Sequence, residues 1–307
     1  MVLLGILYVY LGWLILIYML MLLLLVAFLV LLERKVLGMV QARKGPNIVG
    51  LFGMVQTILD GVKLLTKKFV FSGSSMFFYI APFMGLMLAF IHWFVVPFPF
   101  NFWNSEYSVI FSFVIMGFLV FVVLWAGWGS ESGYGLIGSV RGVAQMISYE
   151  VVFMFYLCCF VLVMKGYNWD DFLGIEMYVG TFLKLFLFIV WVVLILAELN
   201  RTPFDLVEGE SELVSGFNVE FSGYSFTLLF LSEYMNIWFM CVLSALIFGE
   251  CEGLFGGILW GAYVMCILLV RGLLPRFKFN QLIKLMWGVY LPVVFIFMIV
   301  VLVFFSG

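Results

Sequence analysis

The sequence predicts an all-α polytopic membrane protein with eight transmembrane helices. Hydrophobic residues make up 66% of its 307 residues, charged residues make up only 10%, and the mean hydropathy is +1.24. Soluble domains carry roughly 45–50% apolar and about 25% charged residues. A 35.2 kDa globule has too little interior to bury this much apolar surface, so lipid must surround most of the chain.

Eight apolar stretches supply the predicted helices. Each is near or above the roughly 20 residues that a helix needs to cross a bilayer. We expect spans at residues 3–31, 76–98, 108–127, 144–164, 180–197, 222–248, 254–274 and 282–305, which make residues 1–307 a single membrane domain. The first stretch exceeds the length that the hydrocarbon core requires, so its helix should tilt or protrude.

The connection after the first span contains a different kind of helix, at residues 51–68. Apolar residues recur there at helical spacing and polar residues occupy the other faces; the apolar ones are Leu51, Val55, Ile58, Val62 and Leu65. This pattern is typical of an amphipathic helix that lies on the membrane surface. Packing against a partner subunit would explain it equally well, and both contacts can exist together.

The lysines and arginines predict the orientation in the membrane. Thirteen of the 15 lie in the connections after spans 1, 3, 5 and 7 or at the adjoining helix ends, and only Lys165 and Lys184 lie on the other side. The thirteen are Arg34, Lys35, Arg43, Lys44, Lys63, Lys67, Lys68, Arg141, Arg201, Arg271, Arg276, Lys278 and Lys284. Inner loops carry such an excess of basic residues, so we expect both termini on the outer side.

The chain lacks the common ligand patterns of a redox centre. None of the five cysteines forms a CxxC pair, and His92 is the only histidine. This excludes the usual iron–sulfur and structural zinc spacings, as well as two-histidine haem or copper sites. We therefore expect no metal and no covalently bound cofactor, and we interpret His92 as a structural polar residue near a helix end. No basic cluster with interleaved aromatic residues suggests nucleic-acid binding.

Three carboxylates lie where the surroundings are predicted to be lipid. Glu150 lies within the fourth span, Glu198 closes the fifth, and Glu233 lies within the sixth. A charge at this depth is costly unless it is paired, hydrated or neutralised, so we expect a polar cavity beside these residues. The alternative is a structural role in which Arg141 or hydroxyl groups hold the carboxylates.

The connection between the fifth and sixth spans, residues 198–221, is an acidic inner loop. Its carboxylates share a single basic residue, Arg201; they are Glu198, Asp205, Glu208, Glu210, Glu212 and Glu220. Interleaved apolar residues favour a loop packed into protein over one that is merely solvated. Packing like charges together should raise some of their pKa values toward neutrality and couple their titration. Such a loop could take up or release protons when a neighbouring site changes charge.

Several motifs in this sequence resemble one known family. They are Glu33-Arg34-Lys35, Arg43-Lys44-Gly45-Pro46-Asn47, residues 144–150 (AQMISYE), residues 200–218 (NRTPFDLVEGESELVSGFN) and Leu274-Pro275-Arg276-Phe277. Together they resemble subunit 1 of the proton-pumping NADH:quinone oxidoreductase, respiratory complex I. The resemblance runs from about residue 25 to 290, and the motif at 200–218 is highly specific. Lys68, Lys278 and Asn280 depart from the family's usual residues.

The resemblance implies a core membrane subunit that has no redox centre of its own and forms much of the ubiquinone access chamber. Ubiquinone is then the substrate, whereas NADH, FMN and the iron–sulfur clusters bind only to partner subunits. The implied partners are the peripheral quinone-site subunits, neighbouring small membrane subunits and lipid. The implied location is the mitochondrial inner membrane, with both termini facing the intermembrane space, or alternatively a bacterial plasma membrane. The implied chamber residues are Arg34, Arg43, Phe217, Tyr234 and Arg276.

The resemblance also implies that the acidic residues couple quinone reduction to proton translocation. Reducing a quinone by two electrons requires two protons in a site shielded from water, and the resulting charge change would shift the coupled carboxylates. The implied residues are Glu150, Glu198, Arg201, Asp205, Glu208, Glu210, Glu212, Glu220 and Glu233. Two alternatives are the corresponding connector subunit of a membrane-bound hydrogenase, which needs no quinone, and a stand-alone cation/proton antiporter, which usually carries a lysine or histidine at mid-span.

Overall fold

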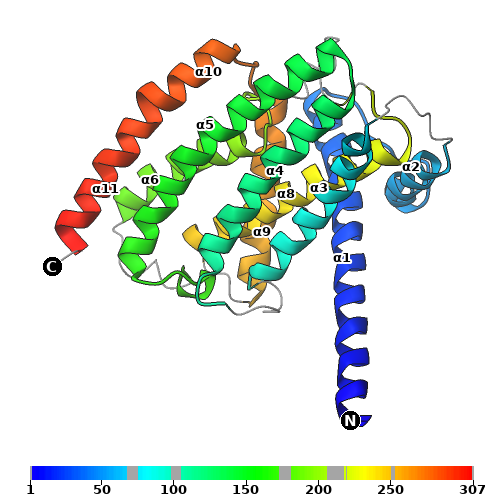
Figure 1. Ribbon diagram of the computed structural model, residues 1–307, viewed down its shortest axis with the longest axis horizontal. Coiled ribbons are helices and arrows are strands. Elements are labelled where there is room, and N and C mark those ends of the chain that lie inside the picture. The colour runs from blue at the N-terminus through cyan, green and yellow to red at the C-terminus, as the bar shows by residue number, and fades with distance from the viewer. Residues whose placement is uncertain are drawn as a thin grey trace.

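The computed structural model describes residues 2–67, 75–97, 105–172, 181–205, 218, 220–249 and 253–305. Within these ranges every regular element is a helix, which agrees with the predicted all-α class. Figure 1 shows tilted helices packed side by side, with α1 projecting from the body toward the N-terminus and α11 on the opposite flank.

The helices follow the order of the predicted spans. Their bounds are α1 Val2–Val40, a 3-10 turn Leu51–Gly53, α2 Met54–Thr66, α3 Met76–Val95, α4 Ser108–Gly129, α5 Gly133–Met164, α6 Thr181–Glu198, α8 Tyr224–Phe248, α9 Gly253–Leu273, and α10 Phe279–Leu285, which continues through Met286–Tyr290 into α11 Leu291–Phe305.

Seven helices of the described chain are long and apolar enough to cross a membrane. Their qualifying segments are Gly12–Val40, Met76–Val95, Ser108–Gly129, Gly133–Met164, Tyr224–Phe248, Gly256–Leu273 and Phe279–Val303. The chain is therefore a polytopic membrane protein, as predicted. The helix expected as the fifth span, α6, supplies a shorter apolar segment, Leu185–Glu198.

Helix α5 begins earlier than the predicted start near residue 144. Its first residue is Gly133, and the side-chain oxygen of Ser132 accepts a hydrogen bond from the backbone N–H of Gly135 at 3.2 Å. This contact caps the helix start and satisfies one of its free donors. A Cβ on Gly127 of α4 would collide with Ser139, so glycine allows α4 and α5 to approach closely. The glycine-rich residues 127–135 therefore form a closely packed connection between α4 and α5.

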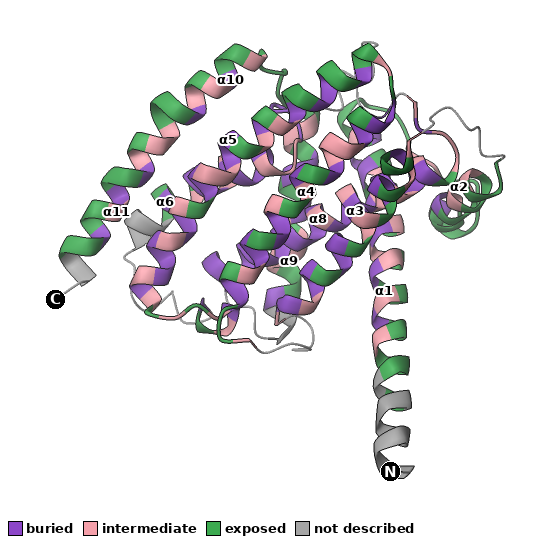
Figure 2. Ribbon diagram, viewed as in Figure 1, coloured by how far each residue is buried: buried purple, intermediate pink, exposed green. Residues whose placement is uncertain are grey.

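Helix α8 lies at the centre of the bundle. Within its apolar segment 67% of the residues are buried, against 22% in the segments of α9 and of α10–α11. In Figure 2 the buried residues concentrate on α8, while the outer helices present exposed faces. Buried indoles tie α8 to its neighbours: Trp93 of α3 donates to the carbonyl oxygen of Met235 at 3.2 Å, and Trp238 donates to that of Leu25 in α1 at 3.0 Å. Polar groups on α8 are therefore shielded from lipid.

Candidate functional site

A buried ion network joins α1, α8, α9 and the segment after α6. Its centre is Glu33, which lies inside α1 and is only 5% exposed. The Tyr234 hydroxyl donates to Glu33 Oε2 at 2.6 Å, Arg271 pairs with Oε1, and Arg201 Nη1 lies 3.8 Å from the same oxygen. Removing a carboxylate from water is costly, and these partners compensate its charge.

Arg201 connects this network to the segment that follows α6. Its side chain is 4% exposed, and its guanidinium carbon lies 4.7 Å from the centre of the Tyr234 ring. A guanidinium over an aromatic face is attracted by the electron density of the ring. Tyr234 therefore contacts both charges of the network, the Glu33 carboxylate through its hydroxyl and the Arg201 guanidinium through its ring.

Residues 199–205 are packed into the protein. Gln145 of α5 donates from Nε2 to Asn200 Oδ1 at 2.8 Å and to the carbonyl oxygen of Phe204 at 2.7 Å. Asp205 is buried and lies 3.3 Å from Nη2 of Arg276. The part of the acidic loop that the structure describes is thus held by specific polar contacts.

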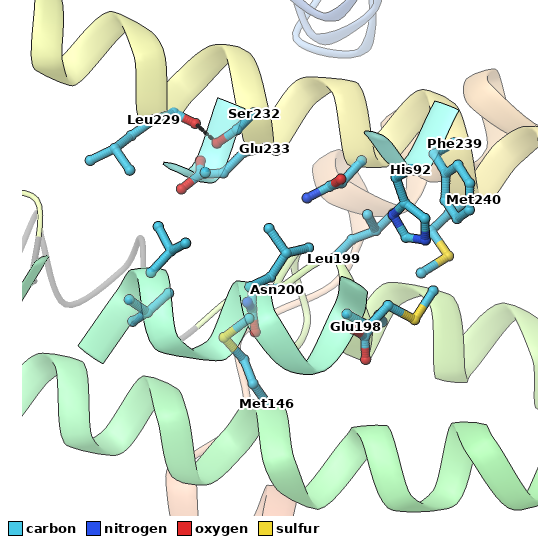
Figure 3. A pocket seen from close by; sticks show the side chains of 16 residues that line it. His92, Met146, Glu198, Leu199, Asn200, Leu229, Ser232, Glu233, Phe239 and Met240 are labelled. Atoms are coloured by element: carbon cyan, nitrogen blue, oxygen red, sulfur yellow. Dashed lines mark hydrogen bonds between the residues drawn. The ribbon is translucent and has the colours of Figure 1, made fainter. Parts of the chain in front are cut away.

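A cavity of about 90 Å³ lies between α3, α4, α5, α8 and the end of α6. Figure 3 shows Glu233 reaching into it from α8 and Glu198 from the end of α6. Its polar lining residues are His92, Glu198, Asn200, Ser232, Glu233 and Asn236. A buried water needs roughly 10–15 Å³ of such space and two or more polar partners, so the cavity has room for several water molecules.

Two oxygen atoms that line the cavity still need hydrogen-bond partners. Oε2 of Glu198 and Oδ1 of Asn236 are buried and have no hydrogen-bond partner among the residues that the structure describes. Buried polar atoms are normally bonded to protein or to ordered water. The cavity therefore has the chemistry of a hydrated site within an apolar helix bundle.

Glu150, the third carboxylate predicted within the spans, packs against α4. Its Oε1 lies 3.2 Å from the position that a Cβ on Gly117 would occupy. Glycine at this position leaves room for the carboxylate beside the backbone of α4.

The chamber residues implied by the resemblance lie on several elements. Tyr234 and Arg276 belong to the contacts described above. Arg34 is half-exposed and pairs with Asp60 of α2 at 2.8 Å, and Arg43 is exposed in the turn after α1. Phe217 lies outside the described residues.

The implied proton-coupling residues divide into three groups. Glu198 and Glu233 line the cavity, and Arg201 and Asp205 lie in the ion contacts beside it. Glu220 is partly exposed just before α8, and Glu150 adjoins α4. Glu208, Glu210 and Glu212 lie outside the described residues.

Sequence reasoning missed Glu33 and Arg271 as functional candidates. Glu33 follows an uninterrupted apolar run, and one helix contains both and continues to Val40. The first span was predicted to end at residue 31, so Glu33 was not expected to be buried. His92 was expected to be structural near a helix end. It does lie close to the end of α3, but it is 1% exposed and lines the cavity.

Known proteins match most of this chain. A family model described as NADH dehydrogenase matches residues 13–302. The chain is 45% identical over 279 residues to NADH-ubiquinone oxidoreductase chain 1 of Branchiostoma lanceolatum, covering 88% of each chain. It is 40% identical over 286 residues to the protein of that name from Apis mellifera ligustica, covering 92% of this chain and 94% of the relative. It is 43% identical over 289 residues to the Lampetra fluviatilis protein, covering 90% of each.

Proposed function

The chain belongs to the NADH dehydrogenase family, and from that premise we propose that it encloses much of the path to the ubiquinone reduction site and couples that reduction to proton translocation. It is a core membrane subunit of NADH:ubiquinone oxidoreductase, in which ubiquinone is the substrate and other subunits are its partners. Its relatives and its apolar helices place it in the mitochondrial inner membrane as a multi-pass protein. NADH, FMN and the iron–sulfur clusters would bind to partner subunits.

One structural relationship carries the coupling proposal. Arg201 interacts with Glu33 in the ion network, and Glu198, three residues earlier on the same short segment, faces the hydrated cavity. Charges interact more strongly in a protein interior than in water. A change of charge near Glu33 would therefore act on the protonation of Glu198, because Glu198 precedes Arg201 by only three residues.

The chemistry that would drive this change is the reduction of the quinone. The quinone takes two electrons from a partner's centre and two protons from its surroundings. Loss of protons from groups beside the chamber would alter the balance of positive and negative charge at Glu33, Arg201 and Asp205. The carboxylates of Glu150, Glu198 and Glu233 would respond by changing protonation. We assign Glu208, Glu210, Glu212 and Glu220 to the same acidic relay.

The basic chamber lining would be Arg34, Arg43 and Arg276, with Tyr234 and Phe217 as aromatic wall. Of these, Arg34 pairs with Asp60 of α2, a helix whose apolar residues Val55, Ile58 and Val62 are exposed. We propose that α2 with its flanking residues 51–68 lies on the membrane surface, on a partner subunit, or on both. Its pairing with α1 through Asp60 and Arg34 would fix one edge of the chamber entrance.

The proposed topology has eight spans, with α6 as the shorter fifth one and both termini on the intermembrane-space side. Support comes from the thirteen basic residues on the other side. The acidic loop 198–221 then lies on the inner side, beside the peripheral subunits. Neither a hydrogenase connector nor a stand-alone antiporter accounts for the relatives equally well, since these are named as chains of an NADH-ubiquinone oxidoreductase.

A photoreactive ubiquinone analogue in the intact complex tests the chamber assignment. Its label is expected on peptides that contain Arg34, Arg43, Tyr234 or Arg276, and excess unlabelled ubiquinone should prevent the labelling. Label confined to the lipid-facing surfaces of α9 and α11, and insensitive to competition, would remove the chamber from this chain.

A further inference from the structure

The chain's single histidine is buried in the cavity that contains the carboxylates. His92 of α3 is 1% exposed, and its ring stacks on Phe239 of α8 with centroids 3.6 Å apart and an angle of 27° between the planes. Within the described part of the chain, neither Nδ1 nor Nε2 has a hydrogen-bond partner. The stacking holds the ring while leaving both nitrogens available (Figure 3).

The two imidazole nitrogens of His92 require hydrogen-bond partners that the described residues do not provide. A neutral imidazole has one N–H donor and one acceptor nitrogen, and burying both without hydrogen bonds is unfavourable. Asn236 and Glu198 present buried oxygens with the same need in the same cavity. Its volume of about 90 Å³ holds several water molecules, which would satisfy all three side chains at once.

We propose that ordered water in this cavity links His92 to Glu198 and Glu233, and that His92 exchanges protons with these carboxylates. The inference deepens the proposed function and rests on it. In one transfer, the O–H bond of a protonated Glu198 breaks and its proton passes to a water molecule. That water passes one of its own protons to the acceptor nitrogen of neutral His92, where an N–H bond forms. The products are a carboxylate, an imidazolium and an unchanged water.

The charges around the cavity favour this exchange. The ionisable groups in its lining are His92 from α3, Glu198 from the end of α6 and Glu233 from α8. Helices α4 and α5 contribute only apolar side chains, namely Met116, Leu119, Val122, Val123 and Met146. The described lining contains carboxylates and no lysine or arginine. An imidazolium at His92 would therefore face the negative charges of ionised Glu198 or Glu233.

His92 would lengthen the polar path in a defined direction. Glu198 ends α6 on the proposed inner side, whereas His92 lies near Val95 at the end of α3 on the proposed outer side. Proton exchange across the cavity would therefore carry charge part of the way along the membrane normal. His92 would therefore be a titratable group on the proposed outer side of the cavity, in addition to the carboxylates.

The test replaces His92 in the assembled complex, reconstituted in vesicles. His92→Gln keeps a hydrogen-bonding side chain but cannot take up a proton, and His92→Leu removes both properties. Ile91→Leu, on an exposed face of the same helix, is the control for helix packing. We expect His92→Gln to lower NADH-driven proton pumping by about tenfold or more. Its NADH oxidation by a hydrophilic artificial acceptor should equal that of the Ile91→Leu complex, which reports intact assembly.

A second measurement is independent of turnover. Redox-induced infrared difference spectra of the normal complex should contain imidazole bands that disappear in His92→Gln. Normal pumping by His92→Gln at every pH between about 6 and 8 would overturn the role of His92, and so would imidazole bands that persist unchanged in that variant. Glu198→Gln separates this failure from failure of the coupling proposal. If Glu198→Gln abolishes pumping while His92→Gln does not, only the inference about His92 fails; if neither changes pumping, the coupling proposal fails as well.

Discussion

Tyr234 of α8 donates a hydrogen bond of 2.6 Å to Glu33 of α1 across 201 residues of sequence. The ring of the same tyrosine supports Arg201, which lies 3.8 Å from Glu33. One side chain thus holds both members of a buried ion pair. This arrangement joins the C-terminal part of α1 to the segment that carries Glu198.

Replacing Tyr234 by phenylalanine removes the hydroxyl and keeps the ring. Because the lost bond has a charged and buried acceptor, we expect a destabilisation of about 1.5–3 kcal/mol. Thermal inactivation of the purified complex should occur at a lower temperature than normal, with a matching loss of quinone reduction. Tyr134→Phe, which removes an exposed hydroxyl on α5, is the control. Equal thermal stability of normal and Tyr234→Phe complexes would show that the bond is dispensable.

Replacing Glu33 by glutamine should be more harmful than replacing Arg34 next to it. The first change leaves the buried guanidinium of Arg201 beside a neutral amide, and breaking a buried pair typically costs about 3–5 kcal/mol. Arg34 is 45% exposed and its pair with Asp60 is in contact with solvent, so Arg34→Gln should cost about 1 kcal/mol or less. The amount of assembled complex after native electrophoresis measures both effects. Comparable amounts in the two variants would contradict the proposed network.

Gln145→Leu should loosen residues 199–205. The change removes the donor for Asn200 and for the buried carbonyl oxygen of Phe204, at a cost of about 1–3 kcal/mol. Hydrogen exchange of the backbone amides in 199–205 should become faster, and quinone-linked turnover should fall. Ile147→Leu, exposed on the same helix, should leave both unchanged. Unaltered exchange in Gln145→Leu would mean that other contacts hold the segment.

Glu233→Gln should separate proton pumping from electron entry. The substitution keeps the size of the side chain and prevents it from ionising, so proton transfer through the cavity should slow by about tenfold or more. NADH oxidation by artificial acceptors should remain normal because, in the proposed function, NADH, FMN and the iron–sulfur clusters bind to partner subunits. Glu106→Gln, at an exposed position, is the control, and Glu210→Gln is expected to behave like Glu233→Gln. Full pumping in both Glu233→Gln and Glu210→Gln would exclude them from the pathway.

Much of the fold was predictable from the sequence. The seven long apolar helices match predicted spans because a helix satisfies its own backbone hydrogen bonds in lipid and needs a fixed length of apolar residues. Their ends were predicted less well. Helix α5 starts at Gly133 because of the Ser132 cap and the close approach of Gly127 to Ser139, and neither contact has a counterpart in hydropathy. Carboxylates in the spans pointed to a cavity, and Glu198 and Glu233 do line one.

The sequence by itself determined the membrane class, the family motifs and the unusual carboxylates, since these follow from residue types and local spacing. Only the tertiary structure decided which of these residues meet. Glu33 contacts Tyr234 and Arg271, and His92 enters the cavity of Glu198, because the tilt and rotation of each helix depend on packing against all its neighbours. Distant segments become partners through that packing, and no local pattern encodes the outcome.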